Sequence, residues 1–522
     1  MLDSRPYDLC VVGSGVAGAL VATAAVRKGL RVVILEAGRR FDFEDRLDQI
    51  RRHQVLNEPL WPWARDDRDS FVDTSKEAIG HEYDLNTARA KGVGGSTLAW
   101  GGMLMRFQES DFRTASTYGL GVDWPIDYAE LEPYYCLAEE ELGVSGTPSP
   151  TYSPRSKPFP MPAFPHKYEQ RGWEKVADKL GLTFELSPQA KNSQPYDGRS
   201  PCVAYAICEA CPSGARYSAD FHIRKIENAD NCTLLTETVA RRVEVNNSGK
   251  VTAIHASGLD GKEYEIKASR YVIAAHGVET ARILLLSDVG NHSDHVGRYL
   301  QEHWYLAAAG NHPTDRVFPG RIGFETTECN DFYEGAERQE RGALRIEFYN
   351  RSDPLYKASQ LGLWGKQRAD YDCNYFGHWI SLAAEIEHQS NPESRVTLDP
   401  NQKDLFGDPV PHIHFALTDI DRRTHERAHQ IIETLLHERG VPDVERTHNW
   451  AKAPHHQGTC RMHDDPTEGV VDRNCRVHGT DNLYLAGSSV FPSSGGRQPT
   501  LTIAALAIRL GEHLTSTDGG KK

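Results

Sequence analysis

Short apolar runs that end in glycine-rich turns recur along this chain, and the first of them predicts a nucleotide-binding unit. Residues 7–12 form an apolar run of buried-strand length, a glycine-rich turn follows over 13–18, and the alanine-rich segment 19–28 is expected to be helical. A second apolar strand is predicted over 31–35. Strand, turn, helix and strand in this order indicate a βαβ unit with parallel strands.

The turn of this unit has the spacing that binds a dinucleotide. Gly13, Gly15 and Gly18 form G-x-G-x-x-G, which lets the backbone approach a pyrophosphate at the N-terminus of a helix. Glu36 follows the second strand and suits the two hydroxyls of an adenosine ribose. Because its carboxylate would repel a 2′-phosphate, we expect a dinucleotide that lacks this group.

Later segments extend this unit and then change its character. A second glycine-rich loop over 89–97 suits contact with a flat ring or a phosphate, although a plain turn has the same composition. Residues 271–286 and 482–509 are each predicted to be strand, turn and helix. Between them, the alternating segments 344–348 and 394–399 suit an antiparallel sheet, and 419–439 is predicted to be helical.

Composition and charge restrict the classes of function. A chain of 522 residues with 39% apolar and 25% charged residues is expected to fold as two interlocked domains. The formal charge of −14 argues against nucleic acid. The ten cysteines do not form a disulfide framework, and most are expected to be reduced. We expect no transmembrane segment, no signal peptide and a disordered tail over 518–522.

Three cysteines in the middle of the chain, within the segment 197–215, point to metal chemistry. They are spaced Cys202-x5-Cys208-x2-Cys211 and are followed by a turn-forming Pro-Ser-Gly. Three thiolates can hold a three-iron cluster, whereas a four-iron cluster or a structural zinc normally needs a fourth ligand. A buried cysteine pair with one spare thiol is the alternative without metal.

Two segments near the C-terminus carry candidate catalytic groups. His455 and His456 lie beside a polar turn, and an imidazole is a natural base for a hydroxyl proton near neutral pH, although a single histidine is more often structural. Pro499 and Thr500 begin the last predicted helix, whose N-terminus can stabilise negative charge on a cofactor ring. The alternative is a further βα unit whose helix does not stabilise charge on a cofactor.

Taken in order, these motifs resemble those of the glucose–methanol–choline (GMC) oxidoreductases over nearly the full length. The matching segments are the N-terminal unit, 94–97, 296–300, His455-x-x-Gly-Thr and 499–509. Segments 116–126, 131–135 and 197–202 are similar to the catalytic subunits of bacterial FAD-dependent sugar dehydrogenases, which act on glucose, gluconate, fructose or glucosides.

The resemblance implies an α/β fold with an α+β substrate part. A Rossmann-type FAD-binding domain would comprise 1–110, 200–300 and 455–522, and an antiparallel-sheet substrate domain would comprise 111–199 and 301–454. It also implies the residues that contact FAD: Gly13, Gly15, Gly18, Glu36, Gly94, Gly95, Ser96, Thr97, Val239, Gly487, Pro499 and Thr500. Because no histidine stands in 93–103, where some relatives attach the flavin, we expect FAD to be bound noncovalently.

The resemblance further implies roles for the candidate catalytic and metal residues. His455 would be the base, and Cys202, Cys208 and Cys211 would hold a three-iron–four-sulfur cluster. Gln498 stands where the family has His or Asn, so it would orient the substrate hydroxyl with a longer stem. The implied reaction is oxidation of a sugar or glycoside hydroxyl at C1 or C3, with hydride transfer to flavin N5 and electrons leaving through the cluster.

Two other functions remain open from the sequence. One is a sugar or glycoside oxidase that reduces oxygen, and the other is a non-catalytic flavin electron-transfer subunit, for which Gln498 is the only hint. For a dehydrogenase, the resemblance implies a small companion subunit, a cytochrome c acceptor, or both. The expected location is the cytoplasm, or the periplasm if a partner subunit carries the export signal.

Overall fold

A five-stranded parallel sheet forms around the predicted βαβ unit. The computed structural model describes residues 5–56, 70–166, 168–204, 208–317, 327–348, 361–374 and 376–516. The unit consists of β1 (Tyr7–Val12), α1 (Val16–Arg27) and β2 (Val32–Leu35). The strand order is β19-β11-β1-β2-β7, with all neighbours parallel, so the predicted strands β11 (Ala268–Ile273) and β19 (Leu483–Leu485) join β1.

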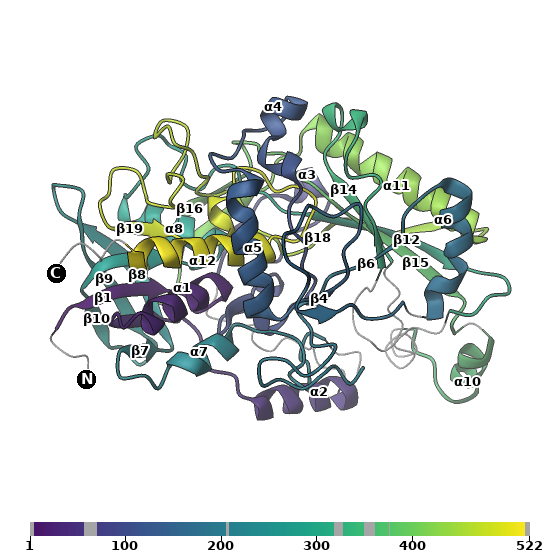
Figure 1. The fold of residues 1–522 in the computed structure, drawn as a ribbon, viewed down its shortest axis with the longest axis horizontal. Helices are drawn as coiled ribbons and strands as arrows, with labels where there is room; N and C mark the ends of the chain where they lie inside the picture. Colours follow the sequence, from purple (N-terminus) through teal and green to yellow (C-terminus); the bar gives the residue numbers. More distant parts are fainter. Residues whose placement is uncertain are drawn as a thin grey trace.

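Helices from the two ends of the chain pack together over this sheet. The last helix, α12 (Thr500–Ser516), lies beside α1 and against α5 (Tyr128–Leu142), and Figure 1 shows the three side by side. A Cβ on Gly511 would lie 2.9 Å from the Cβ of Ala24, so α12 and α1 approach closely at this point. The chain terminus is therefore built into the same layer as the first helix.

A second sheet, six-stranded and antiparallel, forms the other half of the molecule (Figure 1). Its order is β18-β12-β15-β14-β13-β6, and α11 (Asp419–Arg439) packs on β12 and β15. The strands are β6 (Glu185–Leu186), β12 (Trp304–Asn311), β13 (Thr327–Cys329), β14 (Leu344–Glu347), β15 (Trp379–Ile386) and β18 (Glu445–Lys452). The parallel sheet joined to an antiparallel sheet confirms the predicted fold class.

The two alternating segments expected in one antiparallel sheet lie in different sheets. The sequence placed 394–399 in the same antiparallel sheet as 344–348, but β16 (Arg395–Lys403) pairs with β17 (Pro409–His414). These strands and β3 (Val72–Asp73) form a separate three-stranded sheet. A hairpin to a strand that follows closely in the chain closes a short loop, so β16 pairs locally rather than with distant β14.

The remaining elements are smaller. They are α2 (Phe43–Leu56), α3 (Lys76–Ile79), α4 (Thr114–Tyr118), α6 (Glu174–Leu180), α7 (Asp220–Ile226), α8 (Gly277–Ser287), α10 (Gly365–Asn374), the hairpin sheet β8 (Thr238–Val245), β9 (Val251–Gly258) and β10 (Glu263–Ile266), the strands β4 (Ser145–Gly146), β5 (Met161–Pro162) and β7 (Cys232–Leu235), and the short 3₁₀ turn η3 (Gly95–Leu98). The predicted connection over 145–200 thus contains α6 and short strands.

Each large sheet has its own hydrophobic core. Residues such as Val11, Ile34 and Val272 belong to one buried cluster, and Leu306 and Leu382 belong to another. All ten cysteines are free thiols, in agreement with the expected reduced state. Within the described residues, every helix is too short or too polar to cross a membrane. The tail over 518–522 lies outside the described residues.

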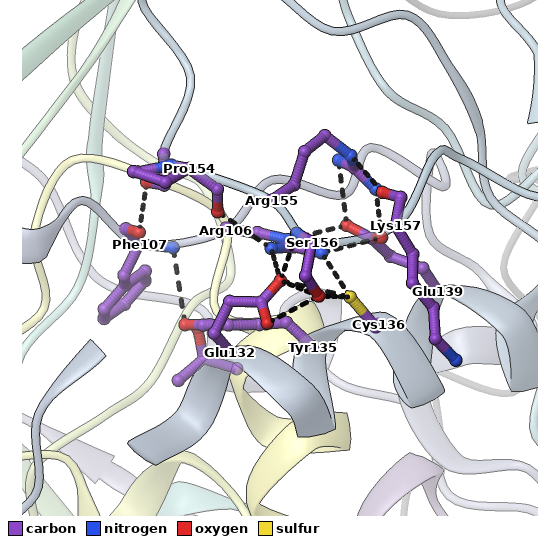
Figure 2. A network of polar contacts seen from close by, with 12 residues as sticks. Arg106, Phe107, Glu132, Tyr135, Cys136, Glu139, Pro154, Arg155, Ser156 and Lys157 are labelled. Atoms are coloured by element: carbon purple, nitrogen blue, oxygen red, sulfur yellow. Dashed lines mark hydrogen bonds and ion pairs between the residues drawn. The ribbon is translucent and has the colours of Figure 1, made fainter. Parts of the chain in front are cut away.

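A buried ion-pair network holds α5 to the loop that follows it (Figure 2). The Arg106 guanidinium donates to both oxygens of Glu139, at 2.9 and 3.0 Å, and to Glu132 at 2.9 Å. Arg155 binds the same Glu139 carboxylate. Arg106 and Glu139 are 4% and 1% exposed, so this is a core interaction rather than a surface one.

Candidate active site

A cavity of about 560 Å³ lies between the parallel sheet and the antiparallel sheet. Most of the residues predicted to contact FAD or substrate line it: Gly13, Gly15, Glu36, Gly95, Ser96, Thr97, Val239, His455, Gly487, Gln498, Pro499 and Thr500. Gly18, Gly94 and the three cysteines do not line it. The cavity volume is typical of a site for a cofactor and a small ligand.

The three glycines of the first turn have different reasons to be glycine. Gly13 has φ of 96°, and a Cβ there would lie 2.4 Å from the Ala274 oxygen. A Cβ on Gly18 would lie 2.0 Å from the Gly13 oxygen. At Gly15 the nearest atom to a Cβ is the Gly95 Cα, 3.9 Å away. The first and third glycines therefore allow close packing, while Gly15 leaves the N-terminus of α1 open to the cavity.

Glu36 is fixed at the end of β2 by three hydrogen bonds. One oxygen accepts the Ser14 N–H at 3.0 Å and the Ser14 hydroxyl at 2.6 Å, and the other accepts the Gly38 N–H at 2.9 Å. Burial raises the pKa of Glu36, and these hydrogen bonds act against the rise. The carboxylate is thus held rigidly at the edge of the cavity, where it can receive the hydroxyls of a ribose.

The second glycine-rich loop is tied to two other parts of the fold. The Gly94 N–H donates to the Ser14 hydroxyl at 3.2 Å, which joins the loop to the first turn. Thr97 Oγ donates to the Gly94 carbonyl at 2.5 Å and accepts the Ala219 N–H at 2.8 Å. Gly94 therefore holds the loop in place without lining the cavity, whereas Gly95, Ser96 and Thr97 line it.

His455 lies in the cavity wall and is held through one ring nitrogen. Its Nδ1 is 2.7 Å from Glu385 Oε1 and 3.0 Å from His303 Nδ1, and its backbone N–H donates to Glu302 at 2.6 Å. The side chain is 19% exposed. Because Nδ1 is engaged with protein groups, Nε2 is the nitrogen left for a ligand. A neighbouring carboxylate that orients an imidazole in this way is a common arrangement for a general base.

His456 points in another direction. Its Nε2 is 2.7 Å from the Tyr83 hydroxyl, which in turn donates to Glu302 at 2.5 Å. The side chain is fully buried, and burial holds the pKa of His456 well below its usual value. It also borders the cavity, where its Nε2 is engaged by Tyr83 and its buried Nδ1 has no hydrogen-bond partner among the described residues.

Gln498 joins the cavity to a group of buried charges. Its amide nitrogen donates to Glu347 at 3.1 Å and to Glu385 at 2.8 Å. Its amide oxygen has no hydrogen-bond partner among the described residues, although the side chain is only 8% exposed. An orphaned acceptor in the wall of a cavity fits a ligand that brings a hydroxyl donor.

Sequence reasoning missed the residues that hold this site, namely His303, Glu385, Arg345 and Glu347. Arg345 binds Glu328 at 2.9 Å, Glu385 at 2.6 Å and Glu347. Burial acts to raise the pKa of Glu385, but the charges of His455 and Arg345 and the imidazole hydrogen bonds hold it well below its usual range. The signal that could have identified these residues in the sequence was the presence of charged residues within the otherwise apolar strands β14 and β15.

The cysteine segment lies behind the second glycine-rich loop. Cys208 and Cys211 are buried and Cys202 is half-buried. Arg216 donates to the carbonyls of Thr97 at 2.6 Å and Leu98 at 2.8 Å, and its backbone N–H donates to Cys211 Sγ at 3.3 Å. In the part of the chain that the structure describes, the three sulfurs do not converge within 4.8 Å, as the ligands of one zinc ion would.

The surroundings of Cys211 favour negative charge on its sulfur, whereas burial raises the pKa of Cys202. Burial acts to raise the pKa of Cys211, but the Arg216 charge and N–H outweigh it and lower the pKa. Burial lowers the pKa of Arg216 to about 10, and its guanidinium donates to the carbonyls of Thr97, Leu98 and Glu209. A buried cation beside thiols fits thiolate ligands of a metal cluster better than it fits neutral thiols.

Comparisons with known proteins agree with this geometry. The GMC oxidoreductase family profiles match residues 7–305 and 390–507. The fructose dehydrogenase large subunit of Gluconobacter japonicus is 30% identical over 97% of this chain and 97% of that protein. The 6'''-hydroxyparomomycin C oxidase of Streptomyces lividus is 29% identical over 98% and 92%. The crystal structure of pyridoxine 4-oxidase from Mesorbium loti superposes with a TM-score of 0.67, at 19% identity over 97% and 99% of the two chains.

Proposed function

The chain belongs to the GMC oxidoreductase family, and from this premise we propose that it is an FAD-dependent enzyme that oxidises a hydroxyl of a sugar or glycoside. The observation that carries the proposal is the placement of His455. Its Nδ1 is held by Glu385 and His303 in the wall of the cavity, beside the amide of Gln498. A base, an orienting carboxylate and a hydroxyl-binding amide thus meet at one point.

The cofactor would be FAD, held without a covalent bond. Gly13, Gly15 and Glu36 suit the pyrophosphate and the adenosine ribose, and the loop with Gly95 and Thr97 suits the flavin end. Glu36 supports a nucleotide without a 2′-phosphate. When bound, FAD supplies the acceptor for the hydride of the substrate carbon at its N5 atom.

His455 would remove the substrate hydroxyl proton at Nε2. Its Nδ1–H would stay directed at Glu385, whose carboxylate stabilises the imidazolium that forms. The low pKa of Glu385 keeps this carboxylate ionised, so it does not compete for the proton. Loss of a positioned base of this kind normally slows a reaction by about 10²–10⁴-fold.

Gln498 would hold the substrate oxygen. Because its amide nitrogen is already bonded to Glu347 and Glu385, the free amide oxygen is the group that can accept the substrate hydroxyl. The extra methylene relative to Asn extends this oxygen farther from the helix. We therefore propose that Gln498 replaces the usual His or Asn without loss of the hydroxyl contact.

The substrate class follows from the relatives and from the cavity. One relative is named for fructose and another for an aminoglycoside, and both cover nearly all of this chain. Trp100 lines the cavity, and its indole N–H donates to the Tyr217 carbonyl at 2.8 Å, which fixes the ring for stacking on a pyranose face. Oxidation at C1 or C3 would use the same groups.

Electrons would leave through an iron–sulfur cluster on Cys202, Cys208 and Cys211. Support comes from the Arg216 bonds to Thr97 and Leu98, which place this segment directly behind the loop at the flavin end of the cavity. The relative named as a large subunit supports a companion subunit. With that subunit, we propose cytochrome c as the acceptor. The proposed location is the cytoplasm, or the periplasm after export with that subunit.

An oxygen-using oxidase is the second candidate, because one relative that covers nearly the whole chain is named an oxidase. The two are separated by a sugar and glycoside screen on protein purified without oxygen, with peroxide formation and dye reduction measured in parallel. Dye reduction without peroxide, together with bound iron, supports the dehydrogenase. Peroxide at the rate of substrate oxidation supports the oxidase, and no flavin reduction by any sugar would contradict both.

A further inference from the structure

Three ligand atoms from distant parts of the chain meet beside the cavity. His303 Nδ1, His455 Nδ1 and Glu385 Oε1 form a triangle with edges of 3.0, 3.4 and 2.7 Å. They are the one set of three such atoms within 4.8 Å of one another in the described ranges. We propose that this triangle binds a divalent transition-metal ion, with Zn²⁺ as the representative, and that the ion is an inhibitor of the enzyme.

The dimensions of the triangle suit zinc. Zinc bonds to imidazole nitrogen and carboxylate oxygen are about 2.0–2.1 Å long, so two donors on a tetrahedron lie about 3.3 Å apart. The 3.4 Å edge already has this length, and the other two need to open by about 0.3 and 0.6 Å. Two imidazoles and one carboxylate are a ligand set that zinc uses when a fourth position stays open.

The ligands are oriented by the groups around them. His303 Nε2 is 3.2 Å from the Ser494 carbonyl, so a ring that carries its one proton on this nitrogen presents the Nδ1 lone pair to the triangle. The other oxygen of Glu385 accepts Arg345 at 2.6 Å and Gln498 at 2.8 Å. Hydrogen bonds of this kind to a carbonyl and to a carboxylate are typical behind zinc ligands.

The triangle is buried and lies among negative charges. Glu385 is 2% exposed, and its Oε1 lies 2.7 Å from His455 Nδ1 and 3.4 Å from His303 Nδ1. The buried carboxylates Glu328, Glu347 and Glu385 outnumber Arg345, the guanidinium that pairs with all three. A cation between the three ligands would bind Oε1 and offset this negative charge.

The expected consequence is reversible inhibition, and this part rests on the proposed function. An ion on His455 Nδ1 requires the neutral ring to carry its single proton on Nε2, so the Nδ1 proton is released to solvent, Nε2 takes one up, and the ring keeps one proton. His455 then has no lone pair to accept the substrate proton. Because His455 and Glu385 line the cavity that would also hold the sugar, we expect the ion and the sugar to compete.

Zinc binding is tested on the FAD-loaded protein after dialysis against a chelator. Calorimetric titration with ZnCl₂ and metal analysis should show one bound ion in the wild type. His303→Gln should bind zinc at least about 100-fold more weakly. Gln keeps the bulk of the side chain, and FAD content and thermal unfolding report whether the variant folds. The matched control is His425→Ala, because His425 and His429 form another histidine pair on α11, away from the triangle.

The outcomes are distinct. Equal zinc binding by the wild type and His303→Gln, or loss of the ion in His425→Ala, would overturn the site, as would a wild type that binds no zinc below 100-fold molar excess. Zinc binding that depends on His303, in a protein that oxidises no sugar, would leave the metal site standing and remove the proposed function. Binding and competitive inhibition that disappear together in His303→Gln support both.

Discussion

At the scale of single residues, two adjacent histidines are separated by their contacts. His455 faces the cavity through a ring oriented by Glu385, whereas His456 is buried against Tyr83. The sequence motif already favoured His455, and neighbouring side chains in an extended segment point in opposite directions. Only the structure supplies the reason, because Tyr83, Glu302 and Glu385 are remote in sequence and carry no motif.

The first prediction compares the two histidines. His455→Ala should leave FAD bound and slow flavin reduction by sugar by about 10²–10⁴-fold. His456→Ala should slow it far less but lower the melting temperature, because it empties a buried site and removes the bond to Tyr83. Stopped-flow absorbance and thermal unfolding measure the two effects. A slower reaction in His456→Ala than in His455→Ala would show that the base is assigned to the wrong histidine.

A second prediction concerns Asp111, which is fully buried under the loop that leads to Gln498. Its carboxyl accepts the Tyr333 hydroxyl at 2.9 Å and the Gln108 N–H at 2.7 Å, and burial raises its pKa to about 7. Since the folded protein holds this proton more tightly than the unfolded chain, the contribution to stability is complete below about pH 4 and is lost as the pH rises through 7.

Asp111→Asn removes this titration. The melting temperature of the variant relative to the wild type should therefore rise between pH 5 and pH 8, since only the wild type must bury a charge at the higher pH. Thermal unfolding at several pH values measures the difference. A constant difference over this range would show that Asp111 does not titrate in the folded protein.

At the scale of elements, the cysteine segment is joined to the second glycine-rich loop through the Arg216 hydrogen bonds to Thr97 and Leu98. We predict that Cys208→Ser removes iron and abolishes reduction of an electrode or cytochrome, while substrate still reduces the flavin, because Cys208 does not line the cavity. Iron analysis and the two half-reactions measure this. Cys232→Ser is the control, since Cys232 lies on β7 away from the segment. Full iron and full electron transfer in Cys208→Ser would exclude it as a ligand.

The network on α5 gives a prediction of stability. Arg106→Ala would leave the buried carboxylate of Glu139 with less compensation, so the free energy of unfolding should fall by about 3–5 kcal/mol, lessened by the remaining pair with Arg155. Lys157→Ala, which removes an exposed pair with Glu140, is the control and should show no measurable change. Similar denaturation midpoints for both variants would mean that the Arg106 network is not stabilising.

Element prediction succeeded where the pattern is local and failed where pairing is distant. The helix predicted over 419–439 matches α11, because a capping box of Thr418 and Asp421 starts it and Gly440 ends it. The single antiparallel sheet expected for 344–348 and 394–399 was wrong, because alternation identifies a strand but not its neighbour. Glu385 and Arg345 were missed for a related reason: they sit on β15 and β14, and only the sheet register brings them together.

At the scale of the whole molecule, the site exists because two sheets face one cavity. The parallel sheet supplies the turn with Gly15 and the carboxylate Glu36, and the antiparallel sheet supplies Glu347 and Glu385. The βαβ fingerprint made the first half predictable from sequence. The second half depends on strands that are apolar apart from a few buried charges, which composition alone does not distinguish from structural ion pairs.

Binding at the turn of the parallel sheet can be tested by melting. FAD should raise the melting temperature, since a ligand at 100 times its Kd stabilises the folded state by about 2.7 kcal/mol. A nucleotide with a 2′-phosphate should not raise it. In the absence of FAD, Gly15→Ala should have the same melting temperature as the wild type, because Gly15 has φ of −65° and a Cβ there would meet only the Gly95 Cα, 3.9 Å away. With FAD it should gain much less, because the new methyl group occupies the approach to the N-terminus of α1. Equal stabilisation of both proteins by FAD would show that the pyrophosphate does not bind at this turn.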